Sequence, residues 1–135
     1  MGKDLVLTAR MHYRIVRDDR PEMGPWRITT EGYMYSVGTT EGAEKFSWHW
    51  HPNTSGAHTY PHTHFSDNVI SEEGAFLSRT PMPTGRMTFE SLIRYVITAN
   101  QVQPLCVDWD ARLAQAEGPH KLYRSWHQTP EERTP

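Results

Sequence analysis

The histidines of this chain are concentrated in one short stretch. Five of the eight lie within sixteen residues, in the segments Trp-His-Trp-His-Pro and Thr-Tyr-Pro-His-Thr-His-Phe: His49, His51, His58, His62 and His64. Imidazole ionises near neutral pH and also ligates transition metals, so it can donate a proton, accept one or bind an ion at cellular pH. A group this dense has no obvious purpose in an apolar core.

Three interpretations of this histidine segment stay open from the residues alone. Alternate residues of a strand project from the same side about 6.5–7 Å apart, so either His-x-His pair could converge on a divalent ion such as zinc, manganese or iron. Two histidines could instead act on RNA as general acid and base without a metal, activating the 2′-hydroxyl and protonating the leaving oxygen. In the third interpretation the histidines are structural and hydrogen-bonded along an irregular segment.

The elements that would position these histidines begin with alternating segments. From Leu5 to Val16 apolar and polar residues alternate, which is typical of a strand with one buried face. Trp26 to Val37 predicts a second strand that bends at Gly32. A third strand is expected from Glu44 to His51, with its aromatic residues on one face and its histidines on the other. A fourth extended segment follows from Ala57 to Phe65, and its proline makes it an edge strand or irregular.

The pattern changes to a helical period after a loop that includes a possible short strand near 75–78. Thr88 is a plausible N-cap for a helix that reaches about Ala99, and Asp108 begins a second short helix. We therefore predict an α+β fold, an antiparallel four- to five-stranded meander sheet with two C-terminal helices packed on one face. Residues 1–128 form a single domain in this prediction, and 129–135 a flexible C-terminal tail.

Two alternation patterns converge on the sheet face that the helices would leave uncovered. If the apolar faces of the first and third strands both pack under the helices, Arg10, His12 and Arg14 share the open face with His49 and His51. Fixed arginine forks beside titratable imidazoles can hold a phosphodiester and move protons around it. The alternative is a polar face that is simply solvated, as antiparallel sheets usually have.

Two further residues are candidates for binding substrate. Tyr60 is expected at the edge of the open face, together with the remaining histidines. Arg86 follows Pro-Thr-Gly near a helix start, where backbone N–H groups favour a phosphate.

Composition limits the other classes of function. The 135 residues suit one domain, and a net charge of −2 with a pI near 6.4 provides no global basic field, so any contact with RNA needs a local positive surface. The single cysteine, Cys106, excludes an internal disulfide and a thiolate-rich zinc knuckle. No apolar run approaches the roughly 18 residues of a membrane span, and the first residues do not resemble a secretion signal. We expect a cytoplasmic protein without membrane contact.

One motif points to a known family. The chain contains Thr59-Tyr-Pro-His62, preceded by the aromatic and polar strand at 46–52 and followed by a loop and an amphipathic helix at 84–97. This arrangement, over Tyr33 to Ile97, resembles the TumE-type toxins of bacterial toxin–antitoxin modules. The family usually has adjacent histidines after the proline, whereas this chain has His-Thr-His, so His62 is the residue that carries over. The resemblance implies an intracellular effector that acts on RNA or the translation machinery and is held by a cognate antitoxin.

The leading hypothesis from the sequence is a small toxin-like enzyme that cleaves RNA with histidine acid–base chemistry and needs no cofactor. One alternative is a hydrolase or oxygenase whose His-x-His pairs bind a divalent metal. Another is a non-enzymatic protein-interaction module. The candidate residues for acid, base or metal ligand are His62, His49, His51 and His64, and those for substrate binding are Arg10, His12, Arg14, Tyr60 and Arg86.

Overall fold

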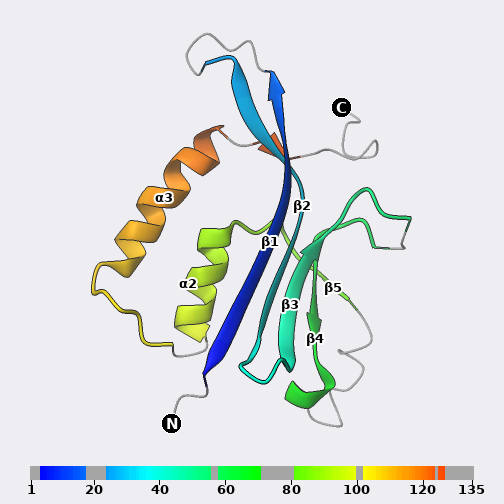
Figure 1. Ribbon diagram of the computed structural model, residues 1–135, viewed down its shortest axis with the longest axis vertical. Helices are drawn as coiled ribbons and strands as arrows, with labels where there is room; N and C mark the ends of the chain where they lie inside the picture. Colours follow the sequence, from blue (N-terminus) through cyan, green and yellow to red (C-terminus); the bar gives the residue numbers. More distant parts are fainter. Residues whose placement is uncertain are drawn as a thin grey trace.

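The computed structural model describes residues 4–17, 24–55, 58–70, 81–99, 102–123 and 125–126. Within these ranges an antiparallel meander sheet is followed by two helices (Figure 1), so the predicted α+β fold is confirmed. The meander runs in the order β1 (Leu5–Arg17), β2 (Trp26–Thr39), β3 (Glu44–Trp50), β4 (His62–Phe65) and β5 (Met82–Pro83). The remaining elements are the 3-10 turn η1 (Asp67–Val69), the helices α2 (Phe89–Ala99) and α3 (Trp109–Tyr123), and β6 (Ser125–Trp126), which pairs in parallel with β2.

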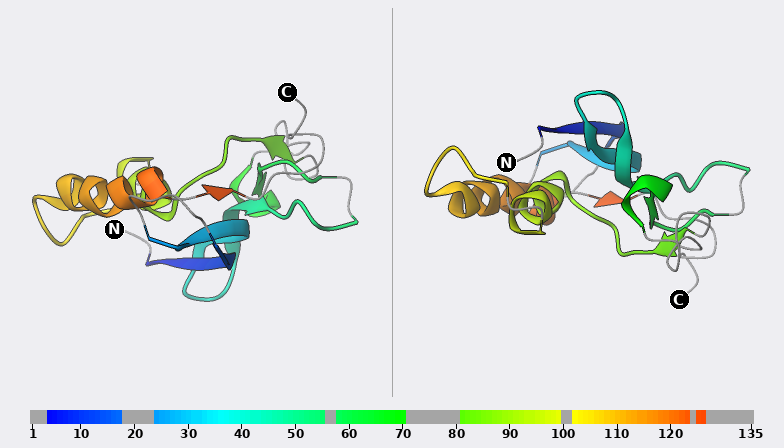
Figure 2. Two further views of the ribbon diagram at one scale, coloured as in Figure 1. Left: turned by 90° about the horizontal axis from the view of Figure 1, so that it is seen from above. Right: turned by 90° about the horizontal axis from the view of Figure 1, so that it is seen from below.

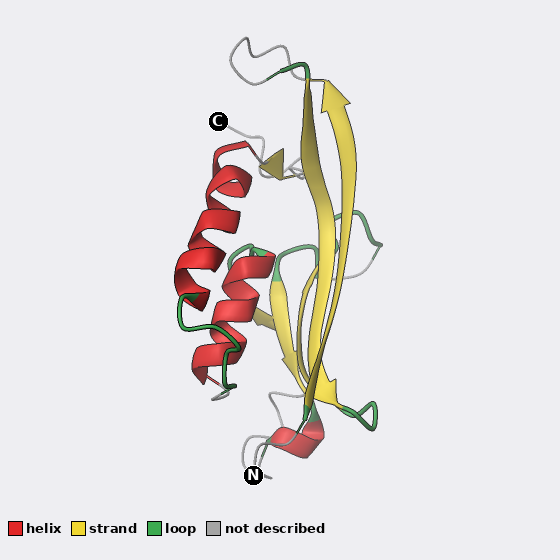
Figure 3. Ribbon diagram, turned by 60° about the vertical axis from the view of Figure 1, so that its left-hand side comes forward, coloured by secondary structure: helices red, strands yellow, loops and turns green. Residues whose placement is uncertain are grey.

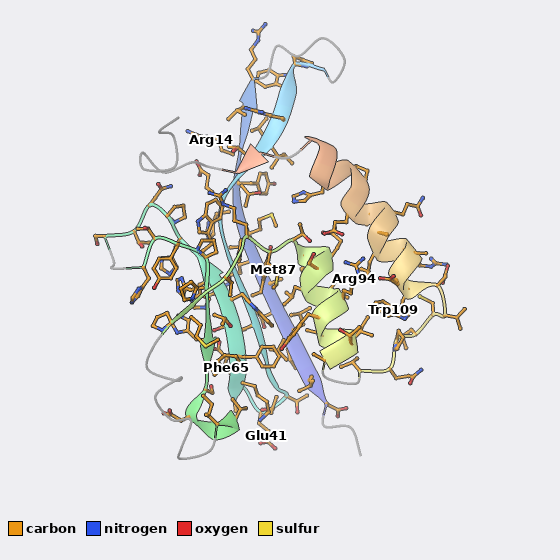
Figure 4. All side chains as sticks on the ribbon, turned by 180° about the vertical axis from the view of Figure 1, so that it is seen from behind. Arg14, Glu41, Phe65, Met87, Arg94 and Trp109 are labelled. Atoms are coloured by element: carbon orange, nitrogen blue, oxygen red, sulfur yellow. The ribbon has the colours of Figure 1, made fainter. Side chains whose placement is uncertain are left out.

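The two helices lie together on one side of the sheet. Figure 2, which looks along the long axis, and Figure 3 both show α2 and α3 side by side, with the strands next to them. The helices are joined by Arg94 of α2, whose guanidinium lies 2.7 Å from an Asp110 carboxylate oxygen and 3.5 Å from the buried carboxylate of Glu117 (Figure 4). Thr88 caps α2 as expected, because its hydroxyl accepts the Ser91 N–H at 3.0 Å.

The core lies between α2 and the aromatic face of β2 and β3. The register places Tyr33 opposite Trp50 and Tyr35 opposite Trp48, so these four rings share one face. Leu92 of α2 and its neighbour one turn later, Val96, complete the buried cluster. Full burial of such a side chain stabilises the fold by about 1.5–3 kcal/mol. The alternation that buries these rings turns the intervening histidines of β3 and β4 to the opposite face.

The buried face predicted for the first strand extends over only part of β1. Leu5, Leu7 and Met11 pack against the core. Tyr13 and Ile15 belong to the same alternation but are 57 % and 62 % exposed. The prediction of one continuous buried face was wrong, because the long β1–β2 ribbon extends past the ends of the helices (Figure 3).

The bend predicted at Gly32 is a bulge. His12 pairs with Gly32 and Tyr13 with Thr30, so Glu31 is the extra residue of β2. A Cβ at Gly32 would lie 2.7 Å from the backbone oxygen of Trp50, so only glycine allows β2 and β3 to approach this closely.

Two boundaries differ from the expectation. The fourth strand begins only at His62, because the segment through Pro61 is irregular. The second helix was expected to be short, but α3 has fifteen residues and continues through Gly118 and Pro119. Glu117 holds this part of α3 against α2, since its carboxylate accepts hydrogen bonds from the Thr88 and Ser91 hydroxyls. The strand considered near 75–78 and the tail at 129–135 lie outside the described residues.

Candidate metal centre

The β3–β4 register brings histidines from two strands together on the face away from α2. His49 of β3 is directly opposite His62 of β4, and Ser47 is opposite His64. The ring centroids of His49 and His62 are 5.7 Å apart, and that of His64 is 5.0 Å and 4.9 Å from them. The three imidazoles are therefore in mutual contact.

His51 joins this group from the turn that follows β3. Its ring centroid is 5.0 Å from that of His62 and 6.1 Å from that of His49. The Thr54 hydroxyl donates its only proton to the His51 carbonyl at 3.1 Å and lies 3.0 Å from His51 Nδ1. With its proton on the carbonyl, the hydroxyl can accept from Nδ1–H, and this tautomer leaves the lone pair on His51 Nε2.

His62 has the same tautomer for a related reason. Its Nδ1 lies 2.7 Å from the backbone oxygen of Tyr60, and a carbonyl can only accept, so Nδ1 carries the proton. The Nε2 lone pair is then free. A ring N–H donated to a backbone carbonyl is the usual outer contact of a metal-ligating histidine, where it sets the tautomer and the ring orientation. His62 itself is 1 % exposed, so the expectation of an open surface was wrong at this residue.

Three ring nitrogens of this group are close enough to share one ion. One ligand nitrogen each from His49, His51 and His62 lies within 4.8 Å of the other two. A tetrahedral ion with metal–nitrogen distances of about 2.0–2.1 Å needs its ligand nitrogens about 3.4 Å apart. The separations in the structure therefore exceed that spacing by at most about 1.4 Å. We call these three residues the histidine triad.

One nitrogen of the triad lacks a partner within the described part of the chain. His49 Nε2 is buried and makes no hydrogen bond there. An unsatisfied buried polar atom costs about 1–3 kcal/mol. A metal ion at the triad would remove that cost by taking the lone pair.

Burial disfavours protonation of two members of the triad, His49 and His62. Desolvation is the main cause that lowers the pKa of His49 to about 4, with repulsion from His64, His62 and His51 adding to it. Desolvation also lowers the pKa of His62 and of His64. At pH 7 only about one His49 ring in a thousand would carry a proton. Neutral imidazole is the form that ligates metals.

A cleft of about 390 Å³ opens beside the triad, and its size lies within the range of small-molecule sites. His49 and His51 line it, and so do Arg10 and His12 of β1. The expected shared face therefore exists for Arg10 and His12. Arg14 does not line the cleft, because it pairs with Glu31 at 3.3 Å instead.

Two other expected substrate residues lie elsewhere. The Arg86 guanidinium is 4.8 Å from the ring centroid of Trp50, which belongs to the core face, and Arg86 does not line the cleft beside the triad. Tyr60 lies next to the histidines, 5.7 Å from His62 by ring centroids, and its hydroxyl is 3.0 Å from Nδ1 of His58.

The sequence analysis missed the residues that orient the triad. Thr54 and the backbone oxygen of Tyr60 set two tautomers. The turn-forming Pro-Asn-Thr-Ser after His51 was a signal for the first, since threonine in such turns bonds to nearby backbone. Gly32 was noted as a bend but not as a lining residue of the cleft.

No protein-family model, curated protein or solved structure matches this chain. The resemblance to TumE-type toxins stays a prediction from the sequence. In the part of the chain that the structure describes, no helix is long and apolar enough to cross a membrane.

Proposed function

We propose that this protein is a metal-dependent hydrolase in which the histidine triad binds one divalent transition-metal ion. The observation that carries the proposal is the convergence of three ring nitrogens within 4.8 Å at a place where buried His49 Nε2 has no other described partner. Imidazole ligands suit zinc, copper, iron and nickel, and we take zinc as the reference ion because it binds three histidines in catalytic sites.

The cleft supports a catalytic rather than a closed structural site. Structural zinc sites fill all four positions with protein ligands, whereas catalytic sites use three and leave one for water or substrate. Two triad members, His49 and His51, line the cleft, so an ion at the triad would lie beside a space that can hold water or substrate. His64 touches the triad but is not among the three residues whose ligand atoms converge, and we assign it no ligand role.

The donor set favours hydrolysis over oxygenation. Oxygenases with a mononuclear iron commonly use two histidines and one carboxylate, and the described triad contains no carboxylate. A divalent ion held by three histidines lowers the pKa of water and polarises the substrate. In hydrolysis the water oxygen bonds to the electrophilic atom, the bond to the leaving oxygen breaks, and the proton of the water ends on that leaving oxygen.

The metal-free acid–base mechanism expected for RNA cleavage has weaker support. It needs one histidine that is substantially protonated near neutral pH. The pKa of His49 is lowered to about 4, so His49 is a poor acid for that role, and desolvation lowers the pKa of His62 and of His64 as well. RNA as substrate, a cognate antitoxin as partner and a cytoplasmic location remain proposals that rest on the sequence.

Metal content of untagged protein tests the proposal directly. We expect one zinc ion per chain by elemental analysis after dialysis, and its loss in His51→Gln and His49→Gln. His12→Gln is the matched control, because His12 lines the same cleft but does not belong to the triad. Substoichiometric metal in the wild type under zinc-replete conditions, or equal content in all variants, would refute the triad as a metal site.

A further inference from the structure

The charges around the cleft limit the kind of substrate that it can hold. Three neutral imidazoles add no negative charge to a divalent ion, so a metal at the triad would keep its full double positive charge. Arg10 adds another positive charge along the cleft. The acidic residue of the cleft, Glu31, is already paired with Arg14 at 3.3 Å. The loaded cleft would thus be strongly cationic.

The register places Arg10 in line with the triad. Arg10 pairs with Met34, Met34 pairs with His49, and His49 pairs with His62, so the four residues form one row across the sheet on the same face. Neighbouring strands are about 4.8 Å apart, so Arg10 is two strands, roughly 10 Å, from His49 along this row. Met34 lies between them, 39 % exposed, and provides an apolar floor.

Arg10 differs from the other arginines expected to bind phosphate. Arg14 is engaged by Glu31, and Arg86 stacks over Trp50. Among the described residues Arg10 makes no ion pair or hydrogen bond, and its exposed side chain lines the cleft. An arginine fork binds two oxygens of one anion at once, which suits phosphate.

We propose that the substrate of this site is a phosphate ester whose anionic oxygens are held by Arg10. This inference rests on the proposed hydrolase function and names its substrate class. A phosphate group, unlike a neutral ester, carries negative charge that offsets the positive charge of the metal-bound cleft. It also has enough oxygens to contact both Arg10 and the histidine triad. Hydrolysis then forms a bond from the water oxygen to phosphorus and breaks the ester P–O bond, with the proton leaving on the released oxygen.

Binding of inorganic phosphate tests the role of Arg10 without any turnover. We expect Arg10→Gln to weaken phosphate binding to the zinc-loaded protein by about 10- to 100-fold, the usual effect of losing a charged hydrogen-bond donor. Arg10→Lys, which keeps the charge but not the fork, should fall between wild type and Arg10→Gln. Arg14→Gln is the matched control from the same strand and should change the affinity less than two-fold, because its partner is Glu31.

The metal-free protein separates this inference from the proposed function. In chelator-treated protein, Arg10→Gln should still bind phosphate more weakly than wild type. If the triad binds no metal but this difference persists, the hydrolase proposal fails and the anion site stands. If zinc binds normally and phosphate affinity is the same in wild type and Arg10→Gln, the inference is overturned while the metal site stands.

Kinetics with three probes identify the phosphate source. We expect cleavage of 4-nitrophenyl phosphate, bis(4-nitrophenyl) phosphate or a single-stranded RNA oligonucleotide to show a raised KM in Arg10→Gln. Preferential cleavage of 4-nitrophenyl phosphate would indicate that the substrate is a small monoester. Preferential cleavage of bis(4-nitrophenyl) phosphate would indicate a diester, and preferential cleavage of the oligonucleotide would indicate RNA. Hydrolysis of neutral 4-nitrophenyl acetate should be unchanged in Arg10→Gln. An equal loss on the neutral ester would contradict a specific role in binding the anion.

Discussion

Zinc should raise the melting temperature of this protein by an amount that can be worked out in advance. A ligand that binds only the folded state at about 100 times its Kd stabilises that state by about 2.7 kcal/mol. Unfolding entropy near 60 °C is about 2.1 cal/mol/K per residue, or about 0.28 kcal/mol/K for 135 residues. Dividing the first value by the second gives a rise of about 10 °C in Tm. The eight histidines of the unfolded chain also bind zinc weakly, so the measured rise should fall somewhat below this value.

The structure assigns this stabilisation to particular atoms. Zinc would be held by one ring nitrogen each of His49, His51 and His62, and the His62 Nδ1 proton is already held by the Tyr60 carbonyl. Replacing one of three ligands should therefore remove most of the rise. His51→Gln is the preferred variant, because this residue lies in the turn after β3 and its loss leaves the aromatic core untouched.

Differential scanning fluorimetry of untagged protein, with zinc and then with excess chelator, provides the assay. His12→Gln should keep the full rise, since this exposed ring of β1 is in the cleft but outside the triad. The chelator should return every sample to its metal-free Tm. The reasoning would be wrong if His51→Gln retained the wild-type rise, or if His12→Gln lost as much of it as His51→Gln.

Three further outcomes follow from individual contacts. Because the pKa of His49 is lowered to about 4 in the folded state, the unfolded chain binds a proton at this residue as the pH falls from 7.5 to 5.5, whereas the folded chain does not. The free energy of unfolding of the metal-free protein, measured by urea unfolding, should therefore fall by at most about 1.4 kcal/mol on account of His49. In His49→Gln this part of the pH dependence should be absent. Gly32→Ala would place a Cβ 2.7 Å from the Trp50 oxygen and should cost about 1–3 kcal/mol, whereas Gly85→Ala, with open space around it, should cost less in the same assay. His64→Gln should keep one zinc per chain by elemental analysis, and its loss would indicate a closed four-histidine site instead.

The fold was predictable because the two faces of a strand such as β3 carry different kinds of side chain. The aromatic and histidine residues of β3 alternate strictly, and this alternation was enough to predict which side meets the helices. The same argument failed for Tyr13 and Ile15, since alternation reports which residues share a face but not how far a helix layer extends along it. Helix length depends on contacts distant in sequence, such as that of Glu117 with Thr88.

The site was predictable only where it depends on strand alternation. The face shared by Arg10, His12 and His49 followed from two alternating strands. His51 was expected on that face too and lines the same cleft, although it lies one residue beyond β3; its contact with the Thr54 hydroxyl in the turn did not follow from alternation. Ion pairing across the bulge, which removes Arg14 from the cleft, likewise has no local sequence signal.

The pairing register of β3 and β4 determines both the packing of the core and the position of the histidines in the candidate site. Directly opposite residues share a face, so the pairing that sets His49 against His62 also sets Trp48 against Thr63. A slip of β3 by one residue would turn His49 into the core and Trp48 and Trp50 outward, and would end the pairing of His49 with His62. Burial of Trp48 and Trp50 under α2 opposes such a slip, at about 1.5–3 kcal/mol for each ring. The aromatic core therefore holds His49 and His62 together although neutral imidazoles have no strong attraction for each other, and a metal would add to an arrangement that packing has already selected.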